Sequence, residues 1–172
     1  MSEAQFQPLR CGVVTVSDSR TPDTDRSGGV IVERLEGAGH VVAERCIVPD
    51  DRERLEALFR QWAADPGLGV VISTGGTGIT GRDVTPEAAD AVLTKAIPGF
   101  GELFRWLSYQ EIGASTIQSR AQAGLAGGTL VFNLPGSSGA CRLALDALIL
   151  PQLDSRTRPC NFAELMPRFG ER

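Results

Sequence analysis

Short runs of apolar residues alternate with segments of helical periodicity along this chain of 172 residues, and that alternation restricts the fold more than any other feature. The runs over residues 10–17, 40–48, 68–73 and 129–134 are predominantly apolar rather than alternating in polarity. Such runs indicate strands whose two faces are both covered. Strands that alternate with helices favour parallel connections. The sequence therefore predicts an α/β fold, a three-layer α/β/α sandwich with a mostly parallel sheet.

Two helical segments place four apolar residues at positions i, i+3, i+4 and i+7, which form one face of a helix. The first segment follows Asp51, and the second follows Gly99 and ends near Tyr109. We expect both faces to be buried in the core. Their members are Leu55, Leu58, Phe59 and Trp62 in the first helix, and Phe100, Leu103, Phe104 and Leu107 in the second.

Signals for helix ends predict three further helices. Ser27 is expected to cap a helix over residues 28–38. Thr85 is expected to cap the next one, with Pro86 at its first helical position. An alanine-rich helix is expected over residues 115–125. All three fit between predicted strands, as the α/β pattern requires.

The last part of the chain is less regular. A helix is expected after residues 135–139, whereas residues 151–172 contain too many prolines for an assignment. This tail carries more apolar side chains than a free end needs, so we expect it to dock on a neighbouring copy, or alternatively on its own domain. The apolar residues are Phe162, Leu165, Met166 and Phe169.

The composition describes one globular domain. Hydrophobic residues make up 42% of the chain and charged residues 22%, and no linker, repeat or low-complexity block interrupts it. We expect a single domain over residues 1–172 with short tails at 1–9 and 163–172. Neither a stretch of about 18 apolar residues nor an apolar leader occurs, which predicts a cytoplasmic protein with no membrane partner. The net charge of −4 argues against nucleic acid as a partner.

Cysteine and histidine usage argues against a metal centre built on these residues. The cysteines form no CxxC pair, which predicts buried thiols rather than a zinc site or a redox centre. The chain also has a single histidine, His40. The four cysteines are Cys11, Cys46, Cys141 and Cys160.

Two glycine-rich turns follow predicted strands. In a parallel sheet, ligands bind at the carboxyl ends of the strands, where backbone N–H groups at helix starts hold phosphate. A glycine-rich turn alone is equally compatible with a tight connection. The turns contain Gly75, Gly76, Thr77 and Gly78, and Pro135, Gly136 and Ser137.

Acidic residues near these turns favour phosphate binding over a purely structural turn. Asp83 follows Gly78 by five residues, and a carboxylate beside bound phosphate is useful when it carries Mg²⁺, which prefers carboxylate and phosphate oxygens. Helix capping is the alternative role, but Thr85 is expected to fill it. Asp50 and Asp51 follow the second strand and either face the same crevice or cap a helix.

Residues 74–88, with the sequence TGGTGITGRDVTPEA, resemble the signature of the MoaB/MogA proteins of molybdenum cofactor biosynthesis, within the molybdopterin-binding superfamily. The resemblance continues through residues 98–124, 129–142 and 151–162 and covers most of the chain from Cys11 onward. The segment LSYQEIG and the tail RTRPCNF are more similar to the MoaB branch than to MogA.

The resemblance implies a molybdopterin-binding-like fold and a molybdopterin adenylyltransferase. Such an enzyme binds molybdopterin through its phosphate, binds ATP with Mg²⁺, and forms adenylyl-molybdopterin and pyrophosphate. By the same resemblance, Asp83 and Asp50 are catalytic residues and Mg²⁺ ligands. The implied phosphate- and substrate-binding residues are Gly75, Gly76, Thr77, Gly78, Arg82, Ser119, Arg120, Pro135, Gly136 and Ser137.

The resemblance also implies assembly into homotrimers, or into hexamers in the MoaB branch, and the molybdate-inserting protein of the pathway as a partner. Some members of that branch have lost the RDVTPEA pattern, which this chain keeps. It departs from many relatives at Ser138, where they carry proline.

The sequence is also compatible with functions other than adenylyl transfer. A non-catalytic molybdopterin-binding or scaffolding protein has the same pattern. A nucleotide-hydrolysing switch that uses GGTG as a phosphate loop is disfavoured, because RDVTP follows the turn and no phosphate-loop lysine exists. Arg82 and Arg120 either neutralise bound phosphate or are solvated surface charges.

Overall fold

The structure, a computed structural model, describes residues 5–171, and its six strands form one sheet in the order β2-β1-β3-β6-β5-β4. β2, β1, β3 and β6 are parallel, whereas β5 runs antiparallel to both β6 and β4. The sheet is therefore mostly parallel, as predicted. The strands are β1 (Arg10–Val16), β2 (Val41–Val48), β3 (Val70–Thr74), β4 (Lys95–Ala96), β5 (Gln122–Ala126) and β6 (Thr129–Leu134).

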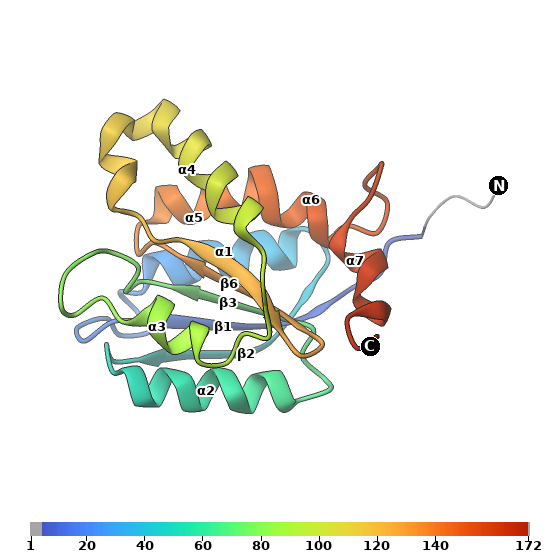
Figure 1. Cartoon of the computed structure of the whole chain (residues 1–172), viewed down its shortest axis with the longest axis horizontal. Helices are drawn as coiled ribbons and strands as arrows, with labels where there is room; N and C mark the ends of the chain where they lie inside the picture. Colours follow the sequence, from blue (N-terminus) through green and yellow to red (C-terminus); the bar gives the residue numbers. More distant parts are fainter. Residues whose placement is uncertain (1–4, 172) are drawn as a thin grey trace.

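Helices cover both faces of the sheet, which confirms the three-layer fold (Figure 1). α1 (Arg26–Gly37), α4 (Pro98–Ile112), α5 (Ser138–Ala144) and α6 (Leu150–Leu153) lie on one face. α2 (Arg52–Ala64) and α3 (Thr85–Asp90) lie on the other. Short turns complete the chain: a 3-10 turn over Gly113–Gln118, a π turn over Leu145–Ile149, α7 (Phe162–Leu165) and a 3-10 turn over Met166–Arg168.

Each face of the sheet has its own core, because successive side chains of a strand point to opposite faces. Val70 and Ile72 of β3 pack with α1, α4 and α5, whereas Val71 between them packs with α2 and α3. The predicted face of α2 is confirmed: Phe59 and Trp62 are buried with Leu55, and Leu58 is half-buried.

The predicted inner face of α4 was partly wrong. Phe100 and Phe104 are buried, but Leu107 is only half-buried and Leu103 is 51% exposed. α4 contacts β5, the strand next to the edge of the sheet, so one flank of the helix has no layer over it.

The predicted helix over residues 115–125 is wrong. The chain forms a 3-10 turn over Gly113–Gln118 and then strand β5, which pairs with β6. Small residues are needed there because neighbours lie close: a Cβ on Gly124 would sit 2.7 Å from both Leu93 Cδ1 and the Lys95 carbonyl oxygen. Pairing and close packing override the helical preference of alanine.

Two predicted helix caps were also wrong. Asp25, not Ser27, caps α1, where it accepts hydrogen bonds from Gly28 N at 3.0 Å and from Thr15 Oγ1 at 2.8 Å. At α3 the cap residue is Val84, which makes no side-chain cap bond, and Thr85 is already helical. The buried hydroxyl of Thr85 is used elsewhere, at the glycine-rich turn.

The C-terminal tail docks on its own domain. Phe162, Met166 and Phe169 pack against the core and Ala163 is buried, whereas Leu165 is 41% exposed. This is the second of the two predicted alternatives, so the preferred expectation, docking on a neighbouring copy, is not needed to cover these side chains. Of the predicted N-terminal tail, residues 1–4 lie outside the described residues.

The prediction of four buried thiols holds for two cysteines. Cys11 and Cys141 are fully buried, and burial raises the pKa of Cys11 to about 12 and that of Cys141 to about 11. Both stay protonated and unreactive at neutral pH. Cys46 is half-buried and Cys160 is exposed, because Cys160 lies in the irregular segment before α7.

Candidate active site

The two predicted glycine-rich turns meet at the carboxyl ends of β1, β3 and β6, on the left in Figure 1. Gly75 N donates to Leu134 O at 3.0 Å, and a Cβ on Gly136 would lie 3.4 Å from Gly75 Cα. The chain passes from β1 to β2 on one side of β1, and then crosses from β2 to β3 on the other side of β1. Ligands of open α/β sheets bind in the crevice at such a reversal of strand order.

The turn after β3 requires glycine. Gly75 and Gly76 have φ values of +100° and +69°, and a Cβ on Gly75 would lie 2.3 Å from Val16 O. Thr85 secures the turn, since its Oγ1 donates to Gly75 O at 2.8 Å and its N donates to Gly76 O at 3.0 Å. The turn is therefore rigid and presents backbone rather than side chains.

A cavity of about 390 Å³ opens beside this turn. It brings together three predicted segments: Gly75–Gly78 with Asp83, Ser119, and Pro135–Ser137. Asp50, Arg82 and Arg120 are not part of its lining. Lining residues that sequence reasoning missed come mainly from α4 and the 3-10 turn after it, the region predicted as a helix: Phe104, Ser108, Ile112, Ser115, Thr116, Gln118 and Ala140.

Asp83 is held by the loop that carries it. Its Oδ2 accepts hydrogen bonds from Thr80 N at 2.9 Å and from Thr80 Oγ1 at 2.7 Å. Burial acts to raise the pKa of Asp83, but the hydrogen bonds from Thr80 and Gly78 and the charge of Arg120 outweigh it and lower that pKa. Asp83 is therefore an oriented carboxylate at neutral pH, and the prediction that it does not cap α3 is confirmed.

Asp50 lies on the other side of the same turn. Its Oδ1 would be 3.2 Å from a Cβ on Gly76. Burial, together with the charges of Asp18 and Asp83, raises the pKa of Asp50. Its neighbour Asp51 is the N-cap of α2 and accepts from Arg54 N at 3.0 Å. The two predicted roles therefore belong to different residues: Asp50 faces the crevice, and Asp51 caps α2.

Asp18, in the loop after β1, was missed by sequence reasoning. Its Oδ1 accepts from Asp50 N at 3.0 Å, and its Oδ2 is paired with Arg82. These contacts join the loops after β1, β2 and β3. A polar segment after a strand was the only sequence signal for it. Arg82 therefore lies at the acidic rim, with its side chain 69% exposed.

Arg120 faces the loop of Asp83 rather than the cavity. Its side chain donates to Gly78 O at 2.7 Å and to Asp83 O at 2.9 Å, and it pairs with Glu87. Ser119, the other member of the predicted pair, lines the cavity.

Two carboxylates fit a nucleotide-bound Mg²⁺ better than a resident metal. Among residues 5–171, no three His, Cys, Asp or Glu side chains converge to hold a metal ion by themselves. Asp50 and Asp83 are close enough for the charge of Asp83 to raise the pKa of Asp50. Mg²⁺ in nucleotide sites takes one or two carboxylates and completes its shell with phosphate oxygens and water. The donor set matches that arrangement.

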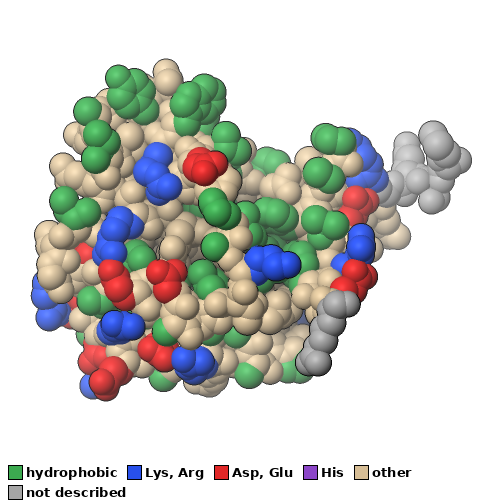
Figure 2. Space-filling view, in the orientation of Figure 1, with side chains coloured by type: hydrophobic (Ala, Val, Ile, Leu, Met, Phe, Trp, Pro, Cys, Tyr) green, Lys and Arg blue, Asp and Glu red, His purple; other side chains and the backbone are tan. Residues whose placement is uncertain are grey.

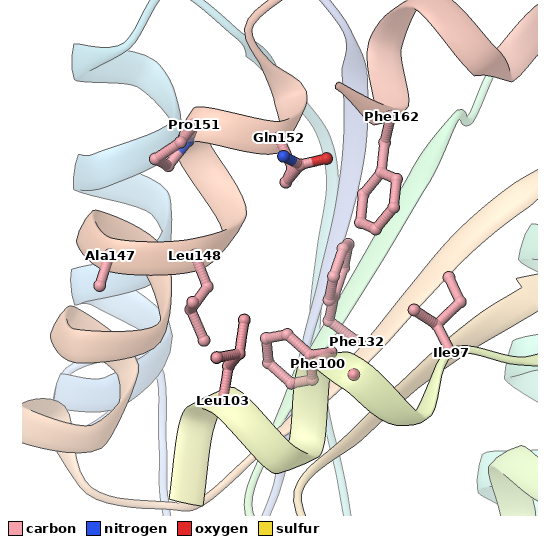
Figure 3. Close-up of a pocket in the computed structure, with 10 residues that line it drawn as sticks. Ile97, Phe100, Leu103, Phe132, Ala147, Leu148, Pro151, Gln152 and Phe162 are labelled. Carbon is pink, nitrogen blue, oxygen red and sulfur yellow. The ribbon is translucent and has the colours of Figure 1, made fainter. Parts of the chain in front are cut away.

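A second cavity of about 390 Å³ lies away from this turn, between α4, α6 and α7 (Figure 3). The rings of Phe100, Phe132 and Phe162 line it, and Gln152 is its one polar side chain. It contains no group that could neutralise phosphate. This apolar cavity therefore does not suit the anionic ligands that the glycine-rich turns favour.

Comparison with known proteins agrees with the geometry. Residues 12–155 match the family model described as a probable molybdopterin binding domain. The chain belongs to the MoaB/MogA family of molybdenum cofactor biosynthesis proteins. This confirms the resemblance found in residues 74–88.

Relatives and solved structures cover nearly the whole chain. It is 47% identical to molybdenum cofactor biosynthesis protein B of Escherichia coli K12 over 158 residues, which are 92% of this chain and 93% of the relative. It is 51% identical to the protein of that name from Bacillus cereus over 146 residues, 84% and 86% of the two chains.

The structural likeness is equally extensive. A crystal structure of a molybdenum cofactor biosynthesis protein B matches with a TM-score of 0.86 and 44% identity, covering 96% of this chain and 98% of the other. The molybdopterin biosynthesis enzyme MoaB of Thermus thermophilus matches with a TM-score of 0.78 and 33% identity, covering 95% and 98%.

Among residues 5–171, no helix is both long and apolar enough to span a membrane.

Proposed function

We propose that the protein transfers AMP from ATP to molybdopterin in a reaction that requires Mg²⁺. The observation that carries the proposal is the meeting of a rigid glycine-rich turn with two carboxylates: Asp83 lines the cavity, and Asp50 lies on the other side of the turn. Family membership supplies molybdopterin as the ligand class. The retained acidic pair favours transfer over simple pterin binding, because a carrier has no need for carboxylates beside phosphate.

The reaction is a substitution at phosphorus. An oxygen of the pterin phosphate attacks the α-phosphorus of ATP, the bond from that phosphorus to the bridging oxygen breaks, and pyrophosphate leaves. The nucleophile belongs to the substrate, so the protein mainly positions two anions and stabilises charge. This accounts for a site without a His, Lys or Cys nucleophile in its lining.

The residues divide this work. Backbone N–H groups of residues 76–78 and the start of α5, which Ser137 caps by accepting from Ala140 N at 3.2 Å, are suited to phosphate groups. Asp50 and Asp83 would hold Mg²⁺. Once bound, the ion neutralises phosphate charge and the charge that develops on the leaving pyrophosphate. The hydroxyls of Ser108, Ser115 and Thr116 offer hydrogen bonds to the polar pterin.

Incubation of the full chain with molybdopterin, ATP and Mg²⁺ tests the proposal. We expect adenylyl-molybdopterin and an equal amount of pyrophosphate by mass spectrometry and a coupled phosphate assay. Tight pterin binding without the adduct would make the protein a carrier and overturn the proposal. Hydrolysis of GTP without pterin would instead indicate a nucleotide switch.

A further inference from the structure

Arg120 contacts one short stretch of chain through both its backbone and its side chain. Its backbone N donates to Thr77 O at 2.9 Å, its Nε to Gly78 O at 2.7 Å, and its Nη2 to Asp83 O at 2.9 Å. Its Nη1 pairs with Glu87, whose other oxygen accepts from Nη2 at 3.3 Å. All three guanidinium nitrogens are thus occupied by the protein itself.

These contacts fasten both ends of the loop that carries Asp83. Gly78 precedes an exposed stretch over residues 79–82, in which Ile79 is 67% exposed, and Asp83 follows it. The planar guanidinium bridges the two ends, since its donors have a fixed fork geometry. An exposed loop without such a bridge would sample many conformations.

Glu87 gives the bridge a fixed anchor. It lies in the first turn of α3, whereas Gly78 and Asp83 lie in the loop before that helix. The hydrogen bond from Arg120 lowers the pKa of Glu87, which therefore remains charged at neutral pH. The Arg120–Glu87 pair connects the end of the turn after α4 to the start of α3.

We propose that Arg120 is a positioning residue and that the Arg120–Glu87 pair clamps the loop so that the Asp83 carboxylate is held at the cavity. This differs from the phosphate-binding role that the family resemblance implies for Arg120. The expected effect on catalysis rests on the proposed function, whereas the expected effect on the conformation of the loop does not.

Substitution of Glu87 separates the two roles of Arg120. Glu87→Ala releases the guanidinium, so an Arg120 that binds phosphate would keep or improve ATP affinity. A clamp predicts the opposite for catalysis: Glu87→Ala and Arg120→Lys each lower kcat at least tenfold and raise the Mg²⁺ concentration for half-maximal rate. The affinity for molybdopterin should change less than twofold. Glu87→Gln, which keeps an acceptor, should restore part of kcat.

Amide hydrogen exchange provides a readout that is independent of activity. Thr80 N donates to the Asp83 carboxylate and Asp83 N donates to Thr80 O at 3.1 Å, so both amides report on the loop. We expect exchange at these two amides to accelerate at least tenfold in Glu87→Ala and Arg120→Lys. Glu53→Ala is the matched control, because Glu53 also lies in the first turn of a helix, α2.

The outcomes distinguish the two proposals. The clamp is overturned if Glu87→Ala keeps the wild-type kcat and the wild-type exchange rates while Arg120→Lys loses affinity for ATP. That result would show that Arg120 is a phosphate ligand. If the unsubstituted chain forms no adduct, the proposed function fails, and the exchange rates alone decide the clamp. If the adduct forms but loop exchange is unchanged in folded Glu87→Ala and Arg120→Lys, only the clamp fails.

Discussion

Thr85 shows how one residue can lead to a correct conclusion for the wrong reason. The sequence predicts that Thr85 caps α3 and so frees Asp83 for chemistry. Asp83 is indeed not the cap, but Thr85 is not either: its hydroxyl holds the Gly75 carbonyl at 2.8 Å. A threonine before proline has the same sequence signature in both roles. Only the path of the preceding turn decides between them.

At the scale of single residues, Asp83→Asn should abolish the proposed adenylyl transfer without unfolding the protein. Asparagine can still accept hydrogen bonds from Thr80 but cannot supply a charged ligand to Mg²⁺. We expect turnover to fall at least about 100-fold, the loss typical of a residue that stabilises transition-state charge. Asp51→Asn is the control, because asparagine caps helices well. Near-normal turnover in Asp83→Asn would contradict its role as a metal ligand.

His40 should make stability depend on pH. Its Nδ1 accepts from Leu9 N at 3.2 Å, and burial lowers its pKa, although the charge of Asp154 opposes the shift. The unfolded chain therefore binds a proton first, near pH 6.5. Stability is complete above that pH and decreases as the pH falls from about 6.5 toward the lowered pKa of the folded state.

Urea unfolding at about pH 7 and about pH 5.5 measures this dependence. His40→Asn retains an acceptor for Leu9 N but does not titrate, so its free energy of unfolding should change less between the two pH values. An equal change in both proteins would assign the effect to other groups.

At the scale of elements, β1 and α2 fit together only because Gly12 lacks a side chain. A Cβ at Gly12 would lie 2.7 Å from Trp62 Cε3. Gly12→Ala should destabilise the fold by about 1–3 kcal/mol, the usual cost of overpacking, as measured by urea unfolding. Gly37→Ala, with open space around its Cβ position, is the control and should not destabilise. A stable Gly12→Ala variant would show that Trp62 moves freely.

Strands and long helices were predictable because their apolar patterns are local. The strands at 10–16 and 129–134 and the buried face of α2 follow from such patterns. β5 does not, because its alanines, leucine and glutamine favour a helix and form a strand only beside β6. Site residues were likewise predictable only where their signal is local. The glycines and Asp83 lie in one short motif, whereas Asp18 and Glu87 belong to the site through contacts with residues 32 to 64 positions away in the sequence.

At the scale of the whole molecule, removal of the chain from Pro159 onward should lower thermal stability and leave any assembly intact. The tail covers its own core through Phe162, Met166 and Phe169. Differential scanning calorimetry should show a melting temperature lower by several degrees, while light scattering gives an unchanged number of chains. A smaller assembly would mean that the tail also contacts a neighbouring copy.

The exposed flank of α4 is the surface we expect to join copies of this chain into the predicted trimer or hexamer. Hydrophobic side chains gather at the top of Figure 2, over this helix, and exceed what a solvated helix face carries. Trp106→Glu should reduce the mass measured by light scattering, whereas Val41→Glu, on the edge strand β2, should not. A monomeric wild-type protein at micromolar concentration would contradict this expectation. The exposed residues are Leu103, Trp106, Tyr109 and Ile112 of α4, and Ile117 of the 3-10 turn that follows it.

The reversed direction of β5 has a consequence for how this protein can change. β5 and β6 pair from Ala126 with Thr129 to Gln122 with Asn133, so the segment that ends at Arg120 and the segment that begins at Pro135 leave the hairpin at the same end. The opposite end is the turn at Gly127 and Gly128, where nothing lies within 4 Å of either Cβ position. Insertions or a grafted reporter peptide there should leave the end of the hairpin that carries the candidate site untouched. This tip is the natural place for length variation during evolution and for engineering.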